Sequence, residues 1–277
     1  MTQPPDARRF KAGFPVFFRY ASAALSTALF MPLCLIGLSW VVPAAAQKLT
    51  DPQDREKYGR CIQLTKSNPD AAFEMALAWQ DFGGGEPAGH CVAAALMGLR
   101  IYDEAARRFE ALAQESRSEA AVRAGIFAHA AQAWLMDGNP RRAESVLDGA
   151  LSLSPDDPAL LIDRAVVRAE RKNLAKAIED LNAAINLDSQ RAEAYVYRAS
   201  ARRQLKQYEA AEADADKALR IDPRNIEGML ERGMLRRMRG DDAGARADWV
   251  KILQIQPNSA AADSARNYLE KMDVKKK

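Results

Sequence analysis

The chain has 277 residues, of which 48% are hydrophobic, a composition typical of a folded globular protein. Its 40 Lys and Arg residues nearly balance its 37 Asp and Glu residues. The first 46 residues hold four of the basic residues and one acidic residue, which leaves 36 of each in the rest of the chain. A remainder without net charge exerts no global attraction on nucleic acid, so we expect no nucleic-acid partner.

The N-terminus has the three parts of a secretory signal peptide. A basic lead precedes an uncharged, largely apolar stretch at residues 20–42, and "PAAAQ" follows it. Ala44 and Ala46 supply the small-x-small pattern that a signal peptidase requires. We therefore expect residues 1–46 to be removed by cleavage between Ala46 and Gln47, and the mature chain to be periplasmic or secreted.

The same apolar stretch allows a second interpretation. About 20 apolar residues can span a bilayer, so an uncleaved leader would anchor the chain in the inner membrane. Ser and Thr side chains dilute the stretch, and a cleavage site follows it at the right place, which favours processing. We expect contact with a membrane only if the leader is retained.

A helical N-terminal region is expected at residues 47–86, and the stretch "WQDFGGGEPAGHC" at residues 79–91 begins within it. The helical pattern "DAAFEMALAWQDF" ends at the glycines, which tolerate positive φ at a helix C-terminus, and Pro87 begins the next helix. A phosphate-binding loop needs a preceding strand and a Lys-Ser/Thr at the start of the helix. The sequence lacks both, so we expect a connecting loop and no cofactor.

Two cysteines, Cys61 and Cys91, lie beyond the leader. An even pair in an exported chain is typical of a structural disulfide. By the chain-entropy relation, a bridge closing this loop of roughly 31 residues stabilises by about 3–4 kcal/mol. We therefore predict a Cys61–Cys91 disulfide.

Other chemistry has little support in the residue spacing. The chain has two histidines, His90 and His129, without metal-ligand spacing, so we expect no metal site. His90 precedes Cys91, but adjacent residues on a helix point about 100° apart, which argues against a Cys–His nucleophile. No Ser-His-Asp set or carboxylate pair stands out, so we expect no catalytic residue and no enzymatic activity.

From about residue 120 the chain repeats with a period of 34 residues. Small residues recur at that spacing at Ala143, Ala177, Ala211 and Ala245. A second small residue stands twelve positions before each of them, at Ala131, Ala165, Ala199 and Gly233. Polar breakers such as "DGNP" and "RGDD" divide each unit, which predicts two short helices that approach closely at the small residues.

This pattern resembles the tetratricopeptide repeat. The resemblance covers residues 124–257 as four units, with a further degenerate unit and an insertion at residues 87–123. Residues 258–277 supply the polar capping helix that a repeat array requires, followed by a basic tail. The implied fold is all-α, a right-handed superhelical solenoid of antiparallel helix hairpins with a C-terminal capping helix.

Charged residues also repeat, on both helices of the last three units. Counted from the first residue of each 34-residue unit, at residues 124, 158, 192 and 226, position 7 of the last three units is Arg164, Arg198 and Arg232. Position 23 of the same units is Asp180, Asp214 and Asp248. In the first unit both positions change together, to Ala130 and Val146, which indicates contact. We favour an Arg–Asp pair within each hairpin. The other interpretation is an anion-binding series of arginines, extended by Arg168, Arg202 and Arg236.

The resemblance implies a protein-interaction module whose first helices line a concave groove. The groove residues would be Leu135, Ile162, Val166, Val196, Ser200, Arg203, Leu230, Met234 and Arg237. Arg203 and Arg237 have no carboxylate counterpart in their own repeat pattern, so this lining suits a peptide or protein with an acidic group.

Two alternatives stay open. These small apolar residues could pack between neighbouring units as core instead of lining a groove. The whole chain could also be a membrane-anchored structural scaffold or an assembly factor of an envelope complex.

Overall fold

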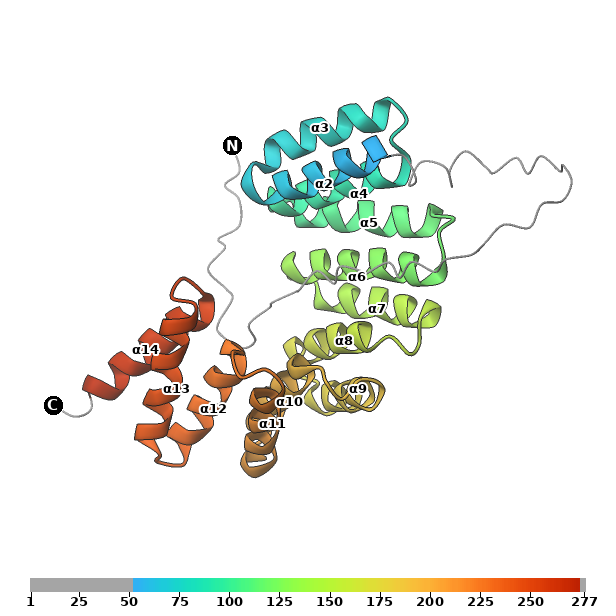
Figure 1. Cartoon of the computed structure of the whole chain (residues 1–277). Coiled ribbons are helices and arrows are strands. Elements are labelled where there is room, and N and C mark those ends of the chain that lie inside the picture. Colours follow the sequence, from blue (N-terminus) through green and yellow to red (C-terminus); the bar gives the residue numbers. More distant parts are fainter. Residues whose placement is uncertain (1–51, 275–277) are drawn as a thin grey trace, which may run out of the picture. The chain divides into compact units, whose positions relative to one another are not determined.

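The computed structural model describes residues 52–274, and in that range the chain forms thirteen helices and no strand (Figure 1). The predicted signal peptide and its cleavage site lie outside the described residues. The described residues fall into two compact units, residues 52–108 and residues 109–274. Within residues 52–274, no helix combines the length and the apolar character needed to cross a membrane.

The first unit packs three helices against one another: α2 (Pro52–Ser67), α3 (Pro69–Asp81) and α4 (Gly85–Gly98). At the start of α3, the Asn68 side chain accepts a hydrogen bond from the backbone N–H of Ala71. Between α3 and α4, Gly83 and Gly85 adopt φ of +81° and +61°. The predicted glycine loop after a helix is therefore confirmed, and α4 begins two residues before Pro87.

Cys61 on α2 and Cys91 on α4 lie side by side and are joined as a disulfide, with a Cα–Cα distance of 6.3 Å. Both side chains are fully buried. One residue before Cys91, His90 shares a hydrogen bond of 3.1 Å with the Tyr58 hydroxyl. The "GHC" stretch thus lies in the packing between α2 and α4.

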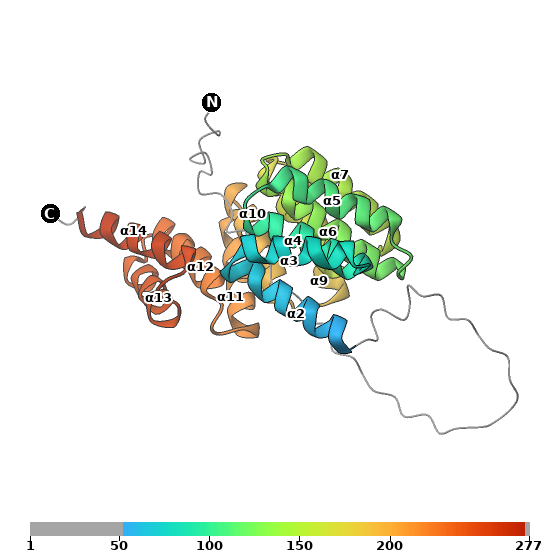
Figure 2. The same cartoon turned by 90° about the horizontal axis from the view of Figure 1, so that it is seen from above.

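The second unit is an array of helix hairpins that follows α5 (Tyr102–Glu115), and the division between the two units falls within the sequence of α5. The hairpins are α6 (Ala120–Met136) with α7 (Pro140–Leu153), α8 (Pro158–Glu170) with α9 (Leu174–Leu187), α10 (Ala192–Gln204) with α11 (Tyr208–Ile221), and α12 (Ile226–Met238) with α13 (Asp242–Ile255). The array ends with α14 (Ala260–Val274), which packs on α12 and α13 (Figures 1 and 2).

The helices of the array contact one another in a regular sequence. Each second helix packs on the first helix of its own hairpin and on that of the next, and the first helices α6, α8, α10 and α12 also contact one another in sequence. The small residues predicted to allow close approach are buried in every hairpin, from Ala131 and Ala143 to Gly233 and Ala245. The all-α repeat fold predicted from the 34-residue period is confirmed.

The turn inside each hairpin depends on one residue with positive φ. The residue at the same repeat position is Gly138, Lys172, Lys206 and Gly240, with φ between +62° and +86°. Glycine adopts this conformation freely, whereas lysine does so at an energetic cost. The repeat geometry therefore imposes the same turn even where the residue does not favour it.

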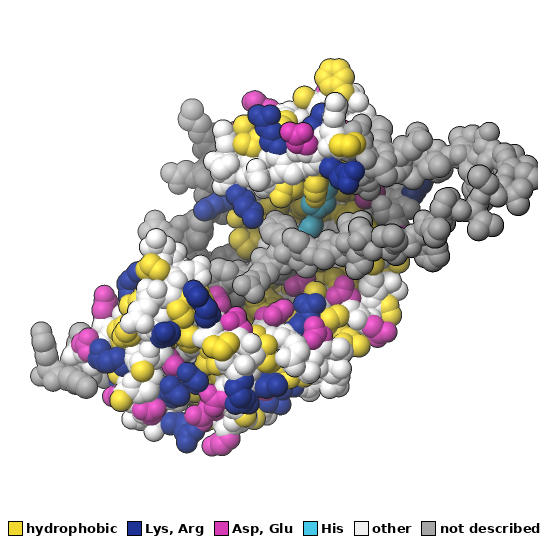
Figure 3. Space-filling model, viewed as in Figure 1, with side chains coloured by type: hydrophobic (Ala, Val, Ile, Leu, Met, Phe, Trp, Pro, Cys, Tyr) yellow, Lys and Arg dark blue, Asp and Glu magenta, His cyan; other side chains and the backbone are white. Residues whose placement is uncertain are grey.

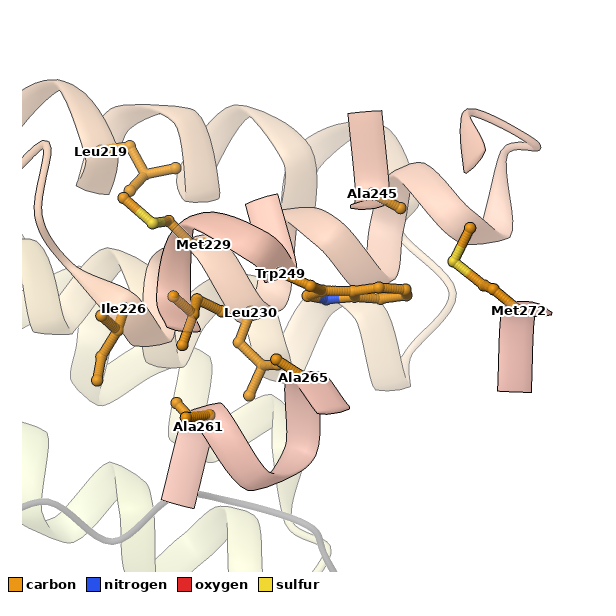
Figure 4. Packing of buried hydrophobic residues seen from close by; sticks show 11 residues of the cluster. Leu219, Ile226, Met229, Leu230, Ala245, Trp249, Ala261, Ala265 and Met272 are labelled. Carbon is orange, nitrogen blue, oxygen red and sulfur yellow. The ribbon is translucent and has the colours of Figure 1, made fainter. Parts of the chain in front are cut away.

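In the last hairpin, a glycine on α12 leaves room for a tryptophan on α13. Trp249 on α13 is 1% exposed and stacks on Tyr268 with ring centroids 5.0 Å apart. Figure 4 shows the Trp249 ring among core side chains that include Leu230 and Met272. A Cβ atom added to Gly233 would lie 2.4 Å from Trp249 Nε1, so only glycine fits there. At the same two repeat positions, the other hairpins have alanine and a residue smaller than tryptophan: Ala131 and Leu147, Ala165 and Leu181, and Ala199 and Ala215.

We predict that Gly233→Ala lowers the free energy of unfolding by about 1–3 kcal/mol, because the new methyl group overpacks the Trp249 ring. In urea unfolding, Gly233→Ala combined with Trp249→Leu should destabilise less than the sum of the single changes. The matched control is Gly149→Ala on α7, where nothing lies within 4 Å of the added Cβ, and it should not destabilise. If the two changes lower the free energy of unfolding additively, Gly233 does not make room for the Trp249 ring.

Candidate interaction surface

Most of the predicted groove residues are not surface residues. Leu135, Ile162, Val166, Val196, Ser200 and Leu230 are each 7% exposed or less. Met234 is partly buried against the C-terminal core. The reason is that the first helices α6, α8, α10 and α12 contact one another directly, so their inward apolar side chains fill the space between units. The prediction that these six residues line an open groove is wrong, and the alternative of core packing describes them.

The two groove arginines also differ from the prediction, because both have a carboxylate partner. Arg203 on α10 donates from Nε and Nη2 to Glu231 on α12, at 2.7 and 3.2 Å. Glu231 is 5% exposed. Burial alone would lower the pKa of Arg203, but the bonds and charge of Glu231 raise it. Arg237 donates to Asp242.

The expectation of a free acidic-group receptor at Arg203 and Arg237 is therefore corrected. The counter-charge of Arg203 does not belong to its own hairpin. Glu231 lies 28 residues away, in the next unit, so the repeat positions within one hairpin do not predict the pair.

An acidic residue near the middle of α8 lacks such a partner. Asp163 on α8 is half-buried, and within residues 52–274 no hydrogen bond or ion pair engages its carboxylate. Its burial, together with repulsion from Asp157 and Glu193, raises its pKa to about 8, against the opposing charge of Arg191.

Repeat position explains why Asp163 stands alone. Asp163 and Leu135 occupy, two repeats earlier, the positions that Glu231 and Arg203 occupy. The chain thus places leucine where an arginine would balance the carboxylate. The 34-residue period does not single out Asp163, because no acidic residue recurs at its position in the neighbouring units.

The predicted Arg–Asp pairs are confirmed and contain one donor more than expected. Arg198 donates from Nε and Nη2 to the two carboxylate oxygens of Asp214, at 2.9 and 2.7 Å. Arg202 donates from Nη1 to the same carboxylate at 2.7 Å. The same three bonds, of 2.7–3.1 Å, recur for Arg164 and Arg168 with Asp180, and for Arg232 and Arg236 with Asp248. We call this arrangement the shared carboxylate.

Each shared carboxylate is deeply buried, since Asp180, Asp214 and Asp248 are 3–5% exposed. Their two arginines supply bidentate and single charge-assisted hydrogen bonds, which a buried carboxylate needs for compensation. The series that was considered as a free anion site is therefore engaged by the protein's own acids. Its role in these hairpins is structural.

Other candidate chemistry is not brought together. Within the described residues, no group of three or more His, Cys, Asp or Glu side chains has a geometry that could hold a metal ion. His129 lies against the Phe109 ring, with centroids 5.4 Å apart, and burial lowers its pKa. Cys91 is joined to Cys61.

We predict that Arg198→Ala lowers the free energy of unfolding by about 1–4 kcal/mol, because it leaves the Asp214 carboxylate with fewer donors. Arg198→Ala combined with Asp214→Ala should recover part of this loss. Arg266 pairs with Asp263 on the exposed face of α14 and is the matched control. Its replacement by alanine should change stability by less than about 0.5 kcal/mol. Equal, small effects of Arg198→Ala and Arg266→Ala in chemical unfolding would refute the buried pair.

Comparison with known proteins agrees with this geometry. Two family models, both described as Tetratricopeptide repeat, match residues 137–192 and 192–225. None of the curated proteins compared matches the chain in sequence.

Among solved structures, MamA 41-end from Desulfovibrio magneticus RS-1 is 19% identical, with a TM-score of 0.52 over 63% of this chain and 97% of that one. The MamA RS-1 ArsTM double mutant is also 19% identical, with a TM-score of 0.51 over 62% and 94% of the two chains. A further MamA structure is 16% identical, with a TM-score of 0.50 over 60% and 95%. At these identities the likeness shows the fold alone. Residues 137–225 thus contain tetratricopeptide repeats, within an all-α helical solenoid.

Proposed function

We propose that the helix array of residues 120–274 is a non-catalytic protein-interaction module that binds a peptide or protein partner along its first helices. Tetratricopeptide repeats are typically interaction scaffolds. The consecutive contacts of α6, α8, α10 and α12 build one continuous surface on which an extended segment can lie. The observation that carries the proposal is Asp163, a half-buried carboxyl group on this surface whose pKa is raised to about 8 and to which no base of residues 52–274 donates a hydrogen bond.

Asp163 also changes the chemistry expected of the partner. The arginines that suggested an acidic ligand are neutralised by Glu231 and Asp242. A lysine, an arginine or another hydrogen-bond donor of a partner would instead restore the pair that Arg203 and Glu231 form two repeats later. We therefore propose a partner segment with a basic group flanked by apolar side chains.

We further propose that the protein works in the cell envelope, exported by residues 1–46 and released by cleavage after Ala46. The Cys61–Cys91 bridge supports this location, because disulfides persist in oxidising compartments such as the periplasm. A retained leader would instead make the chain a membrane-anchored scaffold.

Intact mass spectrometry of the native protein under non-reducing conditions tests both parts of this proposal. We expect the mass of residues 47–277 less two hydrogen atoms, because cleavage removes the leader and the bridge removes the thiol hydrogens. A mass that includes residues 1–46 would favour the anchored scaffold. Two free thiols would contradict both the bridge and the oxidising location.

We predict that Asp163→Asn increases stability and weakens partner binding. A folded-state pKa of about 8 means that ionisation of Asp163 opposes folding increasingly as pH rises from about 4 to about 8. The amide avoids this penalty, so the variant should gain about 1–3 kcal/mol at pH 8 and almost nothing at pH 4. Thermal unfolding across this pH range measures the gain.

Site-specific photocrosslinking in intact cells measures the binding. A photoreactive residue at Gln132, half-buried on α6, should give a discrete partner adduct, and Asp163→Asn should remove most of it. The same photoreactive residue at the exposed Ser152 on α7 is the control and should give no such adduct. Equal adducts at both positions, or an adduct at Gln132 that Asp163→Asn leaves unchanged, would refute the proposed surface.

A further inference from the structure

The three junctions between successive hairpins carry ion-pair networks that can be compared position by position. At each junction, the first arginine of the shared carboxylate also reaches back to the second helix of the preceding hairpin. Arg164 donates to Asp148 at 2.8 Å, and Arg232 donates to Asp216 at 3.1 Å. At the middle junction, Arg198 donates the equivalent hydrogen bond to the neutral side chain of Asn182, at 2.7 Å.

A second pair across the junction follows the same pattern. Glu144 binds Arg171 between α7 and α8, and Glu212 binds Arg239 between α11 and α12, each across 27 residues. Between α9 and α10 the residues at these positions are Ile178 and Leu205, an apolar pair with the same separation. Compared with the outer junctions, the middle junction has two acidic residues fewer, at positions 182 and 178, and one arginine fewer, at position 205.

The loss leaves an unbalanced charge. The α7–α8 junction brings three arginines, Arg164, Arg168 and Arg171, to the three carboxylates of Asp148, Asp180 and Glu144. The α11–α12 junction brings Arg232, Arg236 and Arg239 to Asp216, Asp248 and Glu212, and Arg236 also lies 3.9 Å from Asp241. The middle junction brings Arg198 and Arg202 to Asp214 alone. Figure 3 shows basic and acidic side chains interspersed over the face drawn.

Exposure shows that this place is open. Leu205 is 42% exposed, Asn182 is exposed, and Ile178 is half-buried. Arg198 keeps 14% and Arg202 keeps 22% of its side chain accessible. An accessible apolar side chain thus lies at the same junction as a cationic pair with one carboxylate too few.

We propose that the α9–α10 junction is a second docking site, which binds a partner segment carrying a carboxylate side chain next to a large apolar side chain. The outer junctions identify this occupant, because there the protein itself places carboxylates on the equivalent arginines at hydrogen-bond distance. The partner carboxylate displaces the neutral Asn182 side chain from Arg198 Nη1 and so takes the position that Asp148 and Asp216 hold at the outer junctions. Its apolar neighbour covers Leu205 and Ile178.

The site is distinct from the surface around Asp163. Asp163 selects a basic group, whereas the α9–α10 junction selects an acidic one, so each can fail without the other. Inorganic phosphate could also pair with the two arginines. If phosphate alone competes with the peptide, the site does not require the apolar neighbour, and this result would contradict the proposal.

The test selects peptides from a random library displayed on phage. The library is first depleted on the variant Ile178→Glu/Asn182→Asp/Leu205→Arg, which copies the outer junctions, and is then selected on the wild-type protein. Depletion on this variant also removes peptides that bind at Asp163, which the variant retains. We expect the enriched peptides to carry Asp or Glu beside Leu, Ile, Met or Phe.

Fluorescence anisotropy then measures affinity for the best peptide. Replacing its acid by the amide should weaken binding at least tenfold, and Asn182→Asp in the protein should do so at least fivefold. Asp163→Asn should leave the affinity unchanged. Because the triple variant only copies ion pairs present elsewhere in the array, its unfolding midpoint should match or exceed that of the wild type. The exposed single change Asn182→Asp keeps the test valid if the triple variant is less stable.

Transfer of the site is the strictest control. The variant Glu212→Ile/Asp216→Asn/Arg239→Leu converts the α11–α12 junction to the α9–α10 pattern, and the same peptide should then bind at two places per chain. Enriched peptides without an acid, equal binding to the triple variant, competition by inorganic phosphate alone, or unchanged stoichiometry after transfer would overturn the proposal.

Discussion

The structure of the array depends on one interaction, a buried carboxylate on the second helix of a hairpin that two arginines of the first helix share. Taking such a carboxylate out of water is costly unless charge and hydrogen bonds compensate it, and removing one partner exposes the full penalty. Asp180, Asp214 and Asp248 receive the same three bonds, so three hairpins are closed in the same way. The first arginine also reaches the preceding hairpin, which makes the same contact a link between repeats.

This constraint separates arginines that hold the fold from charges that are available to a partner. The outer junctions neutralise their arginines internally, as does the Arg203–Glu231 pair on the inner helices. Two features of the described residues differ from these pairs: Asp163, to which no base donates, and the α9–α10 junction, which has more arginine than acid. Proteins commonly keep such locally unfavourable charges where a ligand completes them, at some loss of stability. The two proposed surfaces therefore follow from the same comparison of ion pairs between repeats. One surface lacks a base and the other lacks an acid.

Much of the fold could be predicted from the sequence, because a 34-residue period and its small residues specify the hairpin directly. The Arg–Asp contacts could be predicted because both residues change together in the unit that contains Ala130 and Val146. The burial of Ile162 or Val196 could not, since a residue's repeat position does not say how closely the next helix approaches. Glu231 and Asp163 were missed because their partners, present or absent, lie in other repeats. The leader lies outside the described residues, so its cleavage stays a prediction.

Native-state hydrogen exchange of the Asp214→Asn variant tests the shared carboxylate most directly. In a repeat array each unit contacts mainly its neighbours, so losing one central link should act locally. The account predicts reduced amide protection in α10 and α11, a smaller reduction in α9 and α12, and unchanged protection in α2–α4. Unchanged protection in α10 and α11, or a uniform loss across all helices, would contradict the claim that a shared carboxylate closes its own hairpin and links it to the preceding one.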